Sequence, residues 1–463
     1  MKKLGLLLGV VALLVPSLVL AGDIKIGLMC PLTGKWASEG QDMKNIVSLL
    51  VDETNAKGGI NGSKVELVVE DDAGDPRTAA LAAQKLASAG VVAVIGTYGS
   101  AVTEATQNIL AESELVQIGT GSTSVRLTEK GLPLFFRTCP RDDAQGKAAA
   151  AAIIKAGYKK VALLHDTSSY AKGLAEESQA ALEKAGVKII FYDALTPGER
   201  DYTAILTKLK AANPDLIFFT GYYPETGMLL RQKKEMGWDV PMMGGDAANH
   251  QDLVKIAGPE AAAGYFFVSP PLPQDMDTDE AKNFLKAFKD RYKTVPVSVW
   301  AVLAGDAYKV LEAAIAKGNE LKERFVDVMN RDSEVFDGLI ESLALPKDDD
   351  AHKAIRRGAV QASFRNCTLV PLTMMEICSE AIDLCAGLVG TTNPNVVSDL
   401  GIAALTLKTA MESAWLNVLI NLSSLKDKAF RDECCQKGEA LLAHAVPIAQ
   451  ESYEKVLKVI TEK

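Results

Sequence analysis

Short apolar runs alternate with longer amphipathic stretches from residue 24 to about residue 270, and this alternation constrains the fold most strongly. The runs, each of three to six residues, occupy residues 24–29, 65–69, 91–96, 116–119, 161–165, 189–192, 216–220, 242–244 and 265–268. Helical patterns of ten or more residues follow most of them, for example at residues 77–89, 104–113, 143–156, 173–185 and 226–236. The alternation predicts parallel strands joined by right-handed helical crossovers.

Nine strands exceed what one sheet holds comfortably at this length, so we expect two α/β lobes, each built on its own sheet. The breaks between the lobes fall near Pro140 and near Pro270. Residues 270–273 read PPLP, which favours a stiff crossover at the second break.

The pattern changes after about Lys322, where strand-like runs stop. Helical patterns rich in Ala and Leu occupy residues 324–345, 350–388, 399–422 and 426–461, with breaks at Pro346 and at residues 393–395. This part of the chain predicts an antiparallel helical hairpin or bundle.

The first 21 residues predict a cleaved secretory signal. Lys2 and Lys3 give a positive start, and the apolar run at residues 4–20 ends at a small-residue site before Gly22. The mature chain would then lie in the periplasm. An uncleaved membrane anchor is the alternative, which the shortness of the run disfavours.

Composition excludes some classes of function. A net charge of −9 argues against a nucleic-acid binder, which would carry a basic face. The seven cysteines fit no metal-site spacing, so we expect no bound metal. Export would permit disulfides, but we interpret most of these cysteines as small buried apolar residues.

Hydroxyl- and glycine-rich turns follow two neighbouring predicted strands. Residues 97–100 read TYGS, and residues 120–124 read TGSTS. Clefts in open α/β folds lie beyond the carboxyl ends of the strands. Backbone N–H groups and hydroxyls at a helix start hold a carboxylate well, although Ser and Thr also cap helices routinely. The two turns together indicate a carboxylate site.

Complementary groups follow two strands of the second predicted lobe. Residues 221–225 read GYYPE, and Asp246 follows the strand at residues 242–244. A carboxylate can pair with an ammonium group, and an aromatic face adds cation–π attraction. The alternatives are a helix cap for Asp246 and a half-buried surface residue for Tyr222.

Several motifs carry a family resemblance. They read PLTG at residues 31–34, NAKGGING at 55–62, EDDAGDP at 70–76 and FTGYYPE at 219–225. As a set they resemble the periplasmic branched-chain amino acid-binding proteins of ABC importers, over roughly residues 22–317. This resemblance implies an α/β fold of two Rossmann-like lobes, as in type I periplasmic binding proteins, followed here by an all-α segment. The expected parts are a signal peptide (1–21), lobe 1 (22–141 and 267–317), lobe 2 (142–266) and a helical domain (323–463).

The resemblance also implies a ligand clamp. Ser100, Gly121 and Thr123 would hold the α-carboxylate of an amino acid, while Asp246 and Tyr170 would face its α-ammonium group. Asp246 stands where many relatives have Glu, which keeps the charge but shortens the reach.

Three further residues are implied to shape the pocket. Tyr222 would line it, and Trp36 and Glu39 fall in the first strand-to-helix loop, where the family sets side-chain specificity. Glu39 replaces the usual aromatic residue there. It would favour a polar or basic ligand side chain, or else point to solvent.

The tail carries a second resemblance. Residues 345–347 (LPK), 370–372 (VPL), 393–399 (NPNVVSD) and 417–422 (NVLINL) are similar to the helical domain of formiminotransferase-cyclodeaminases and methenyltetrahydrofolate cyclohydrolases. That family acts on tetrahydrofolate derivatives and is usually dimeric. Asp332 and Asp399 match its acidic positions and are candidates for proton transfer or folate contact, with surface or capping carboxylates as the alternative.

Each of the two matched segments lacks part of its family's sequence at the point where the segments join. The tail lacks the PTPGGG segment and long first helix of its family, and the lobes lack the strands that follow Lys317 in theirs. A natural fusion or an assembly chimera of two truncated genes accounts for this, and folate activity would then be impaired.

We therefore expect the periplasmic solute-binding component of an ABC importer, which delivers branched-chain or related amino acids to an inner-membrane permease without a cofactor. The lobes contain no Ser-His-Asp or Cys-His set, and we interpret His165 and His250 as structural or surface residues. A folate one-carbon enzyme carried by the tail is the alternative. A chemoreceptor-like sensor is a third possibility.

Overall fold

The computed structural model describes residues 23–271, 273–389 and 397–461, so the expected signal peptide and the break at residues 393–395 lie outside the described residues. The chain forms two compact units. The first comprises the chain up to Gly131 and Phe135–Glu312, and the second comprises Leu132–Leu134 and Ala313–Lys463.

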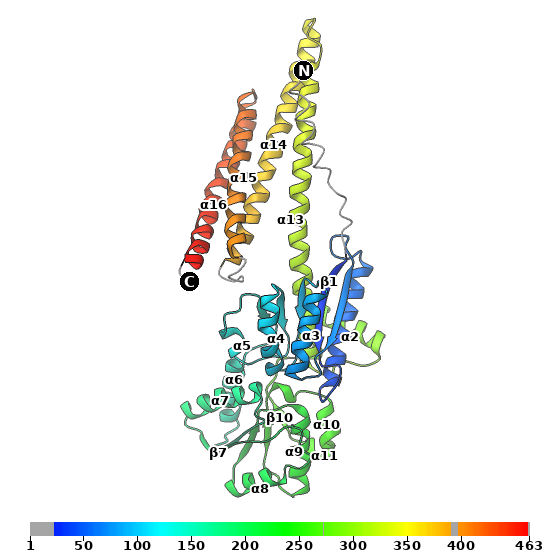
Figure 1. The fold of residues 1–463 in the computed structure, drawn as a ribbon, viewed down its shortest axis with the longest axis vertical. Coiled ribbons are helices and arrows are strands. Elements are labelled where there is room, and N and C mark those ends of the chain that lie inside the picture. Colours follow the sequence, from blue (N-terminus) through cyan, green and yellow to red (C-terminus); the bar gives the residue numbers. More distant parts are fainter. Residues whose placement is uncertain (1–22, 272, 390–396, 462–463) are drawn as a thin grey trace. The chain divides into compact units, whose positions relative to one another are not determined.

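The first unit contains two parallel five-stranded sheets, each flanked by helices (Figure 1). One sheet has the order β2-β1-β3-β4-β5. Its strands are β1 (Ile24–Cys30), β2 (Val65–Asp71), β3 (Ala93–Ile95), β4 (Val116–Gly119) and β5 (Phe135–Arg137). The helices of this lobe are α2 (Ala37–Ala56), α3 (Pro76–Ser88), α4 (Ser100–Glu112), α5 (Arg126–Glu129), α12 (Asp279–Tyr292) and the first turns of α13 (Val299–Ala344).

The other sheet has the order β10-β9-β8-β6-β7. Its strands are β6 (Lys160–His165), β7 (Lys188–Ala194), β8 (Leu216–Phe219), β9 (Met242–Gly244) and β10 (Phe266–Phe267). Around it lie α6 (Asp142–Lys155), α7 (Ser169–Lys184), α8 (Thr203–Ala212), α9 (Tyr223–Glu235), η1 (Asp246–Ala248), α10 (Asp252–Ala257) and α11 (Pro259–Ala262). A short η2 (Pro273–Asp275) follows β10 and precedes α12, which returns to the first lobe.

Local sequence explains why these elements begin and end where they do. All four residues of β8 are apolar and buried, as expected for a central strand covered on both faces. At the start of α3, the Asp75 carboxylate accepts hydrogen bonds from the N–H groups of Arg77 and Thr78. Just after α3, Gly90 has a φ of +74°, the left-handed conformation that ends many helices.

Every predicted apolar run overlaps a strand, and the predicted α/β fold of two Rossmann-like lobes followed by helices is confirmed. The pattern missed β5 because this strand has only three residues, ends in a charged one and pairs with β4 alone.

The second unit is helical throughout its described part. It contains the rest of α13, α14 (Asp350–Leu388), α15 (Val397–Ser423) and α16 (Lys428–Thr461). Its core is apolar and includes Met375, Ile382, Met411 and Val418. Contacts Gln361–Ser424 and Cys367–Asn421 show that α15 runs antiparallel to α14. Contacts Trp415–Gly438 and Lys408–Gln450 show the same for α15 and α16, as the sequence predicted.

The predicted start of the tail helix at residue 324 is wrong. Because α13 is continuous from Val299 to Ala344, it passes through the boundary expected between residues 317 and 323. Gly318 did not stop it, since a single glycine costs only about 1 kcal/mol in a helix interior. Among the described residues, no helix is long and apolar enough to cross a membrane.

Candidate functional site

The candidate site lies where the carboxyl ends of the two sheets meet. In the first sheet β1 and β3 are neighbours, but the chain continues from β1 to β2 on one side and from β3 to β4 on the other. In the second sheet the chain continues in the same way from β6 to β7 and from β8 to β9, in opposite directions. Such switch points form the crevice that binds ligands in open α/β folds. The residues predicted for the clamp follow β1, β3, β4, β6, β8 and β9.

The first lobe contributes hydroxyls and backbone groups. Ser100 is the first residue of α4, and its Oγ accepts a hydrogen bond from the N–H of Ser124 at 3.2 Å. Thr123 is 1% exposed, and its Oγ1 has no hydrogen-bond partner among the described residues. A Cβ on Gly121 would lie 2.5 Å from the ring of Tyr98, so only glycine fits this turn.

The second lobe contributes an acid held by a phenol. The hydroxyl of Tyr170 donates to Oδ1 of Asp246 at 2.8 Å. Oδ2 of this fully buried carboxyl group has no partner in the described part of the chain. Burial raises the pKa of Asp246 to about 7, while the hydrogen bond from Tyr170 opposes the rise. A ligand cation would stabilise the ionised form.

Aromatic rings from both lobes enclose the same region. The ring of Trp36 lies 4.4 Å from that of Tyr222 and 5.2 Å from that of Tyr98. Tyr222 also lies 5.1 Å from Tyr170. All four side chains are buried, so they can contact an apolar ligand side chain or face an ammonium group. The structure thus brings Trp36, Tyr170, Tyr222 and Asp246 together.

Asp142 is a second buried acid beside these residues, and the sequence motifs did not predict it. Asp142 begins α6, and its N–H donates to the carbonyl oxygen of Thr123 at 3.0 Å. Its side chain is fully buried, and its carboxyl group lies beside the Thr123 hydroxyl. The available signal was its position, two residues after the predicted break at Pro140. Tyr98 lies in the turn at residues 97–100, but the sequence predicted no role for it in the site.

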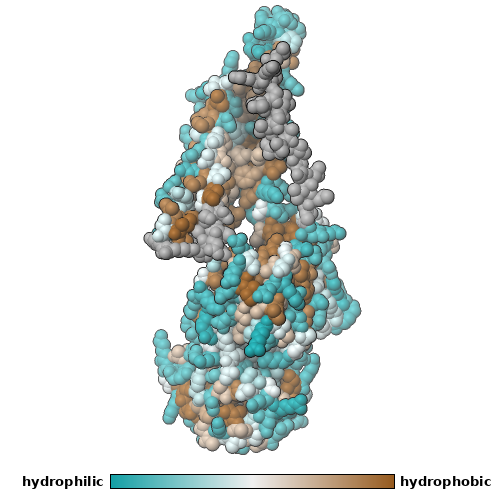
Figure 2. All heavy atoms as spheres, in the orientation of Figure 1, coloured by the Kyte–Doolittle hydropathy of each residue, from teal (hydrophilic) through white to brown (hydrophobic). Residues whose placement is uncertain are grey.

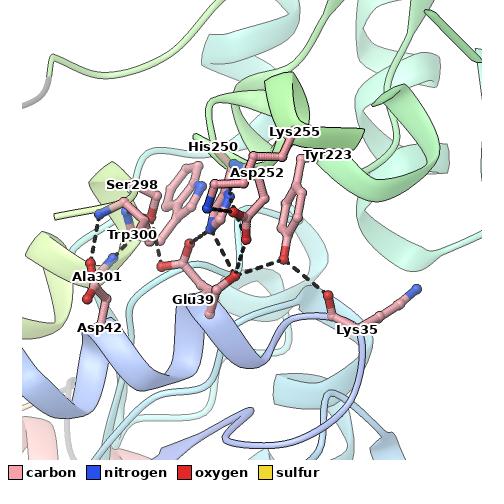
Figure 3. A network of polar contacts seen from close by, with 12 residues as sticks. Lys35, Glu39, Asp42, Tyr223, His250, Asp252, Lys255, Ser298, Trp300 and Ala301 are labelled. Atoms are coloured by element: carbon pink, nitrogen blue, oxygen red, sulfur yellow. Dashed lines mark hydrogen bonds and ion pairs between the residues drawn. The ribbon is translucent and has the colours of Figure 1, made fainter. Parts of the chain in front are cut away.

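Glu39 lies in the first turn of α2 rather than in the preceding loop, because the helix begins at Ala37. The alternative that it points to solvent is wrong, since it is 0% exposed. Its Oε1 accepts a hydrogen bond from Ser298 at 2.7 Å, and its Oε2 lies 3.8 Å from Nε2 of His250 in the other lobe (Figure 3). Burial raises the pKa of Glu39 to about 8 and lowers that of His250 to about 4, so both are uncharged near pH 6.

Further contacts cross between the lobes beside Glu39, and we call them the interlobe latch. Ser38 Oγ donates to Oδ2 of Asp252 at 2.7 Å. The hydroxyl of Tyr223 donates to the carbonyl oxygen of Lys35 in the first lobe at 3.1 Å, and within the second lobe the Tyr223 ring stacks on His250 at 3.9 Å. In Figure 3, His250, Asp252 and Tyr223 all point toward the start of α2.

The tail candidates do not share one site. Asp332 is exposed and lines a groove of about 340 Å³ whose walls include Met329, Met374 and Asn417. Asp399 lies at the start of α15, and its side chain is outside the described structure. The α15 residues of the groove begin at Ala410, roughly 16 Å further along at 1.5 Å per residue.

The described residues contain no group of His, Cys, Asp and Glu suited to a metal ion. All seven cysteines are free thiols, five of them buried. The first unit is a two-lobed α/β protein in which polar groups of both lobes are buried near the carboxyl ends of the two sheets.

Comparisons with known proteins agree with this class. A periplasmic binding protein family model matches residues 23–362, and a formiminotransferase-cyclodeaminase model matches residues 302–440. This chain belongs to the periplasmic binding protein family, which implies an extracytoplasmic protein. The two matches overlap over residues 302–362, which include most of α13 and the start of α14.

The Leu/Ile/Val-binding protein BraC3 of Rhizobium johnstonii is 36% identical over 318 residues, which are 67% of this chain and 85% of that protein. A solved structure of LivJ from Streptococcus pneumoniae in complex with isoleucine has a TM-score of 0.60 and 32% identity, covering 63% of this chain and 83% of its own. The leucine-binding protein LivK of Thermotoga maritima has a TM-score of 0.60 and 30% identity, covering 64% of this chain and 83% of its own.

Proposed function

We propose that this protein binds a branched-chain or related amino acid as the periplasmic solute-binding component of an ABC importer. The observation that carries the proposal is the division of polar groups between the lobes: one lobe supplies the buried hydroxyls of Ser100 and Thr123, and the other supplies the buried Asp246 with its partner Tyr170. The names of BraC3, LivJ and LivK support the ligand class.

The proposed clamp holds the two charged ends of an amino acid from opposite lobes. The α-carboxylate lies against Ser100, Gly121 and Thr123, where the start of α4 adds N–H groups and a favourable helix dipole. The α-ammonium group lies against Asp246 and Tyr170. Because both ends are held only when the lobes meet, the ligand stabilises the closed form.

The proposed function also requires export of the chain and delivery of the ligand to a transporter. Residues 1–21 would direct the chain to the periplasm, where the closed complex would dock on a permease of the inner membrane. The aromatic crevice suits an aliphatic ligand side chain and needs no cofactor.

Calorimetric titration of residues 22–463 with the twenty amino acids tests the proposal. We expect micromolar or tighter binding of at least one aliphatic or polar amino acid. No heat from any of them, with protein shown by circular dichroism to be folded, would reject it.

For the tail we propose binding of a tetrahydrofolate derivative in the groove at Asp332. The groove volume of about 340 Å³ lies within the usual range for small-molecule sites, and the family match supports the ligand class. Titration with 5-formyltetrahydrofolate should give saturable binding that Asp332→Asn weakens. An unchanged affinity in that variant excludes this groove.

We also propose that the tail forms a homodimer. Exposed apolar residues on α13 recur at helical spacing, at Val326, Met329, Phe336, Ile340 and Leu343, and hydrophobic atoms gather on the helices of this unit (Figure 2). Light scattering should show a dimer that Phe336→Lys weakens and that the control Glu334→Lys leaves intact. A monomeric wild-type protein contradicts the proposal.

A further inference from the structure

Lys35 lies in the turn between β1 and α2, and its side chain contacts aromatic rings from both lobes. Its ammonium nitrogen lies 4.6 Å from the centre of the Trp36 ring and 5.8 Å from that of Tyr222 in the second lobe. The proposed site assigns these two rings to the ligand side chain. The Lys35 side chain is 40% exposed, whereas both rings are buried, so its ammonium group lies on the solvent side of the pair.

An acid of the second lobe balances this charge. Oε1 of Glu225, in the first turn of α9, lies 4.0 Å from the Lys35 ammonium nitrogen and accepts a hydrogen bond from the N–H of Gly198 at 3.1 Å. The Glu225 side chain is 3% exposed, and its Oε2 has no hydrogen-bond partner among the described residues. Burial raises the pKa of Glu225, and the charge of Lys35 opposes the rise. Lys35 therefore helps to neutralise a buried acid of the opposite lobe.

The backbone of Lys35 is held against the same segment of the second lobe. Its carbonyl oxygen accepts the latch hydrogen bond from the hydroxyl of Tyr223 at 3.1 Å, while its side chain extends away from the latch (Figure 3). The ring contact, the ion pair and this hydrogen bond all join Lys35 to residues 222–225. A positive charge is thus fixed beside the aromatic wall of the crevice.

We propose that Lys35 is a specificity-determining residue, which makes the crevice reject amino acids that have a cationic side chain. This rests on the proposed function. A cation is attracted to the face of an aromatic ring and to a nearby carboxylate, and Lys35 already takes both positions. A basic ligand side chain would therefore meet a like charge beside Trp36 and Tyr222, whereas a neutral side chain would not.

This preference is opposite to the one that the sequence predicted for Glu39. A basic ligand side chain was expected to pair with that acid, but Glu39 accepts a hydrogen bond from Ser298 and lies beside His250. Removal of the Lys35 ammonium group should instead leave Glu225 as a buried carboxylate without this cation. A basic ligand side chain then supplies the missing positive charge.

The test compares L-lysine with L-norleucine, which has the same carbon chain without the terminal ammonium group. Titration calorimetry near pH 7 gives both dissociation constants, with leucine in place of norleucine if the crevice excludes an unbranched chain. Wild-type protein should bind lysine more weakly, and Lys35→Met should lower the lysine-to-norleucine ratio of dissociation constants by at least about tenfold. Lys35→Arg keeps the charge and should keep the ratio. Lys85→Met, at an exposed lysine that pairs with Glu70 at 3.1 Å, is the control and should also keep it.

A wild-type protein that binds lysine as tightly as norleucine overturns the inference. So does an unchanged ratio in Lys35→Met, and undetectable lysine binding in both proteins counts as that result. If Lys35→Met does not bind norleucine, Lys35→Gln gives the same comparison with a neutral polar side chain. Loss of norleucine binding by both neutral variants would assign Lys35 to closure rather than to specificity, and it overturns the inference too.

The proposed function fails separately from this inference. Wild-type protein that binds norleucine or leucine leaves that function standing, whatever the ratio to lysine. Wild-type protein that binds no amino acid at all rejects the function first.

Discussion

At the scale of single residues, Asp246 is the acid that the proposed clamp assigns to the ligand ammonium group. Burial makes its negative charge costly, and the hydroxyl of Tyr170 recovers only part of that cost. A ligand cation recovers the remainder, so the acid and the ammonium group stabilise each other in the closed crevice. Removing the acid leaves an ammonium group buried without its counter-charge.

We expect Asp246→Ala to weaken amino acid binding by at least about 30-fold, which corresponds to about 2 kcal/mol. Asp246→Glu should bind more tightly than the alanine variant because it keeps the charge. Titration calorimetry measures both. An alanine variant that binds as tightly as wild type would show that the ammonium group lies elsewhere.

The sequence predicts the residues that follow strand ends, such as Ser100, Thr123 and Asp246. In a parallel sheet the carboxyl ends of all strands lie at the same edge, so strand order alone places these residues there. The sequence could not place Glu39 or Asp142. Their environments depend on Ser298 and His250 in one case and on Asp246 in the other, all far away along the chain. A side chain that is buried by elements far away along the chain has no local sequence pattern that predicts its burial.

At the scale of elements, the start of α2 contacts the second lobe through the interlobe latch. Ser38 and Asp252 form its shortest hydrogen bond, at 2.7 Å. Because Lys35 and Ser38 belong to the first lobe and Tyr223 and Asp252 to the second, opening the lobes would break these contacts. None of these four residues belongs to the proposed ligand clamp. The latch therefore stabilises closure whichever ligand is bound.

Ser38→Ala should weaken binding of leucine, isoleucine and alanine by the same factor, several-fold each, because it removes a charge-assisted hydrogen bond of closure. Ser88→Ala, an exposed serine at the end of α3, is the control and should change nothing. Dissociation constants for the three ligands provide the comparison. A change in their ratios would place Ser38 in the ligand pocket instead.

Strand positions were the most predictable part of the fold, since buried parallel strands are apolar along their whole length. Helix ends were less predictable. Residues 299–323 have a helical pattern and no strand-like run to mark where one helix would end and the next begin. The helix α13 continues through them because no proline or capping residue stops it.

At the scale of the whole molecule, one chain joins a two-lobed receptor to a helical unit with its own apolar core. The lobes hold every residue of the proposed clamp, and the tail holds the groove at Asp332. The two proposed binding activities are therefore separable by substitution, with Asp246 testing one and Asp332 the other.

A crystal structure with the tightest-binding amino acid tests the central claim most directly. We predict the ligand carboxylate within hydrogen-bond distance of Ser100 and Thr123, and its ammonium group within the same distance of Asp246. A ligand bound outside the crevice, or bound there with its two ends reversed, would contradict the account.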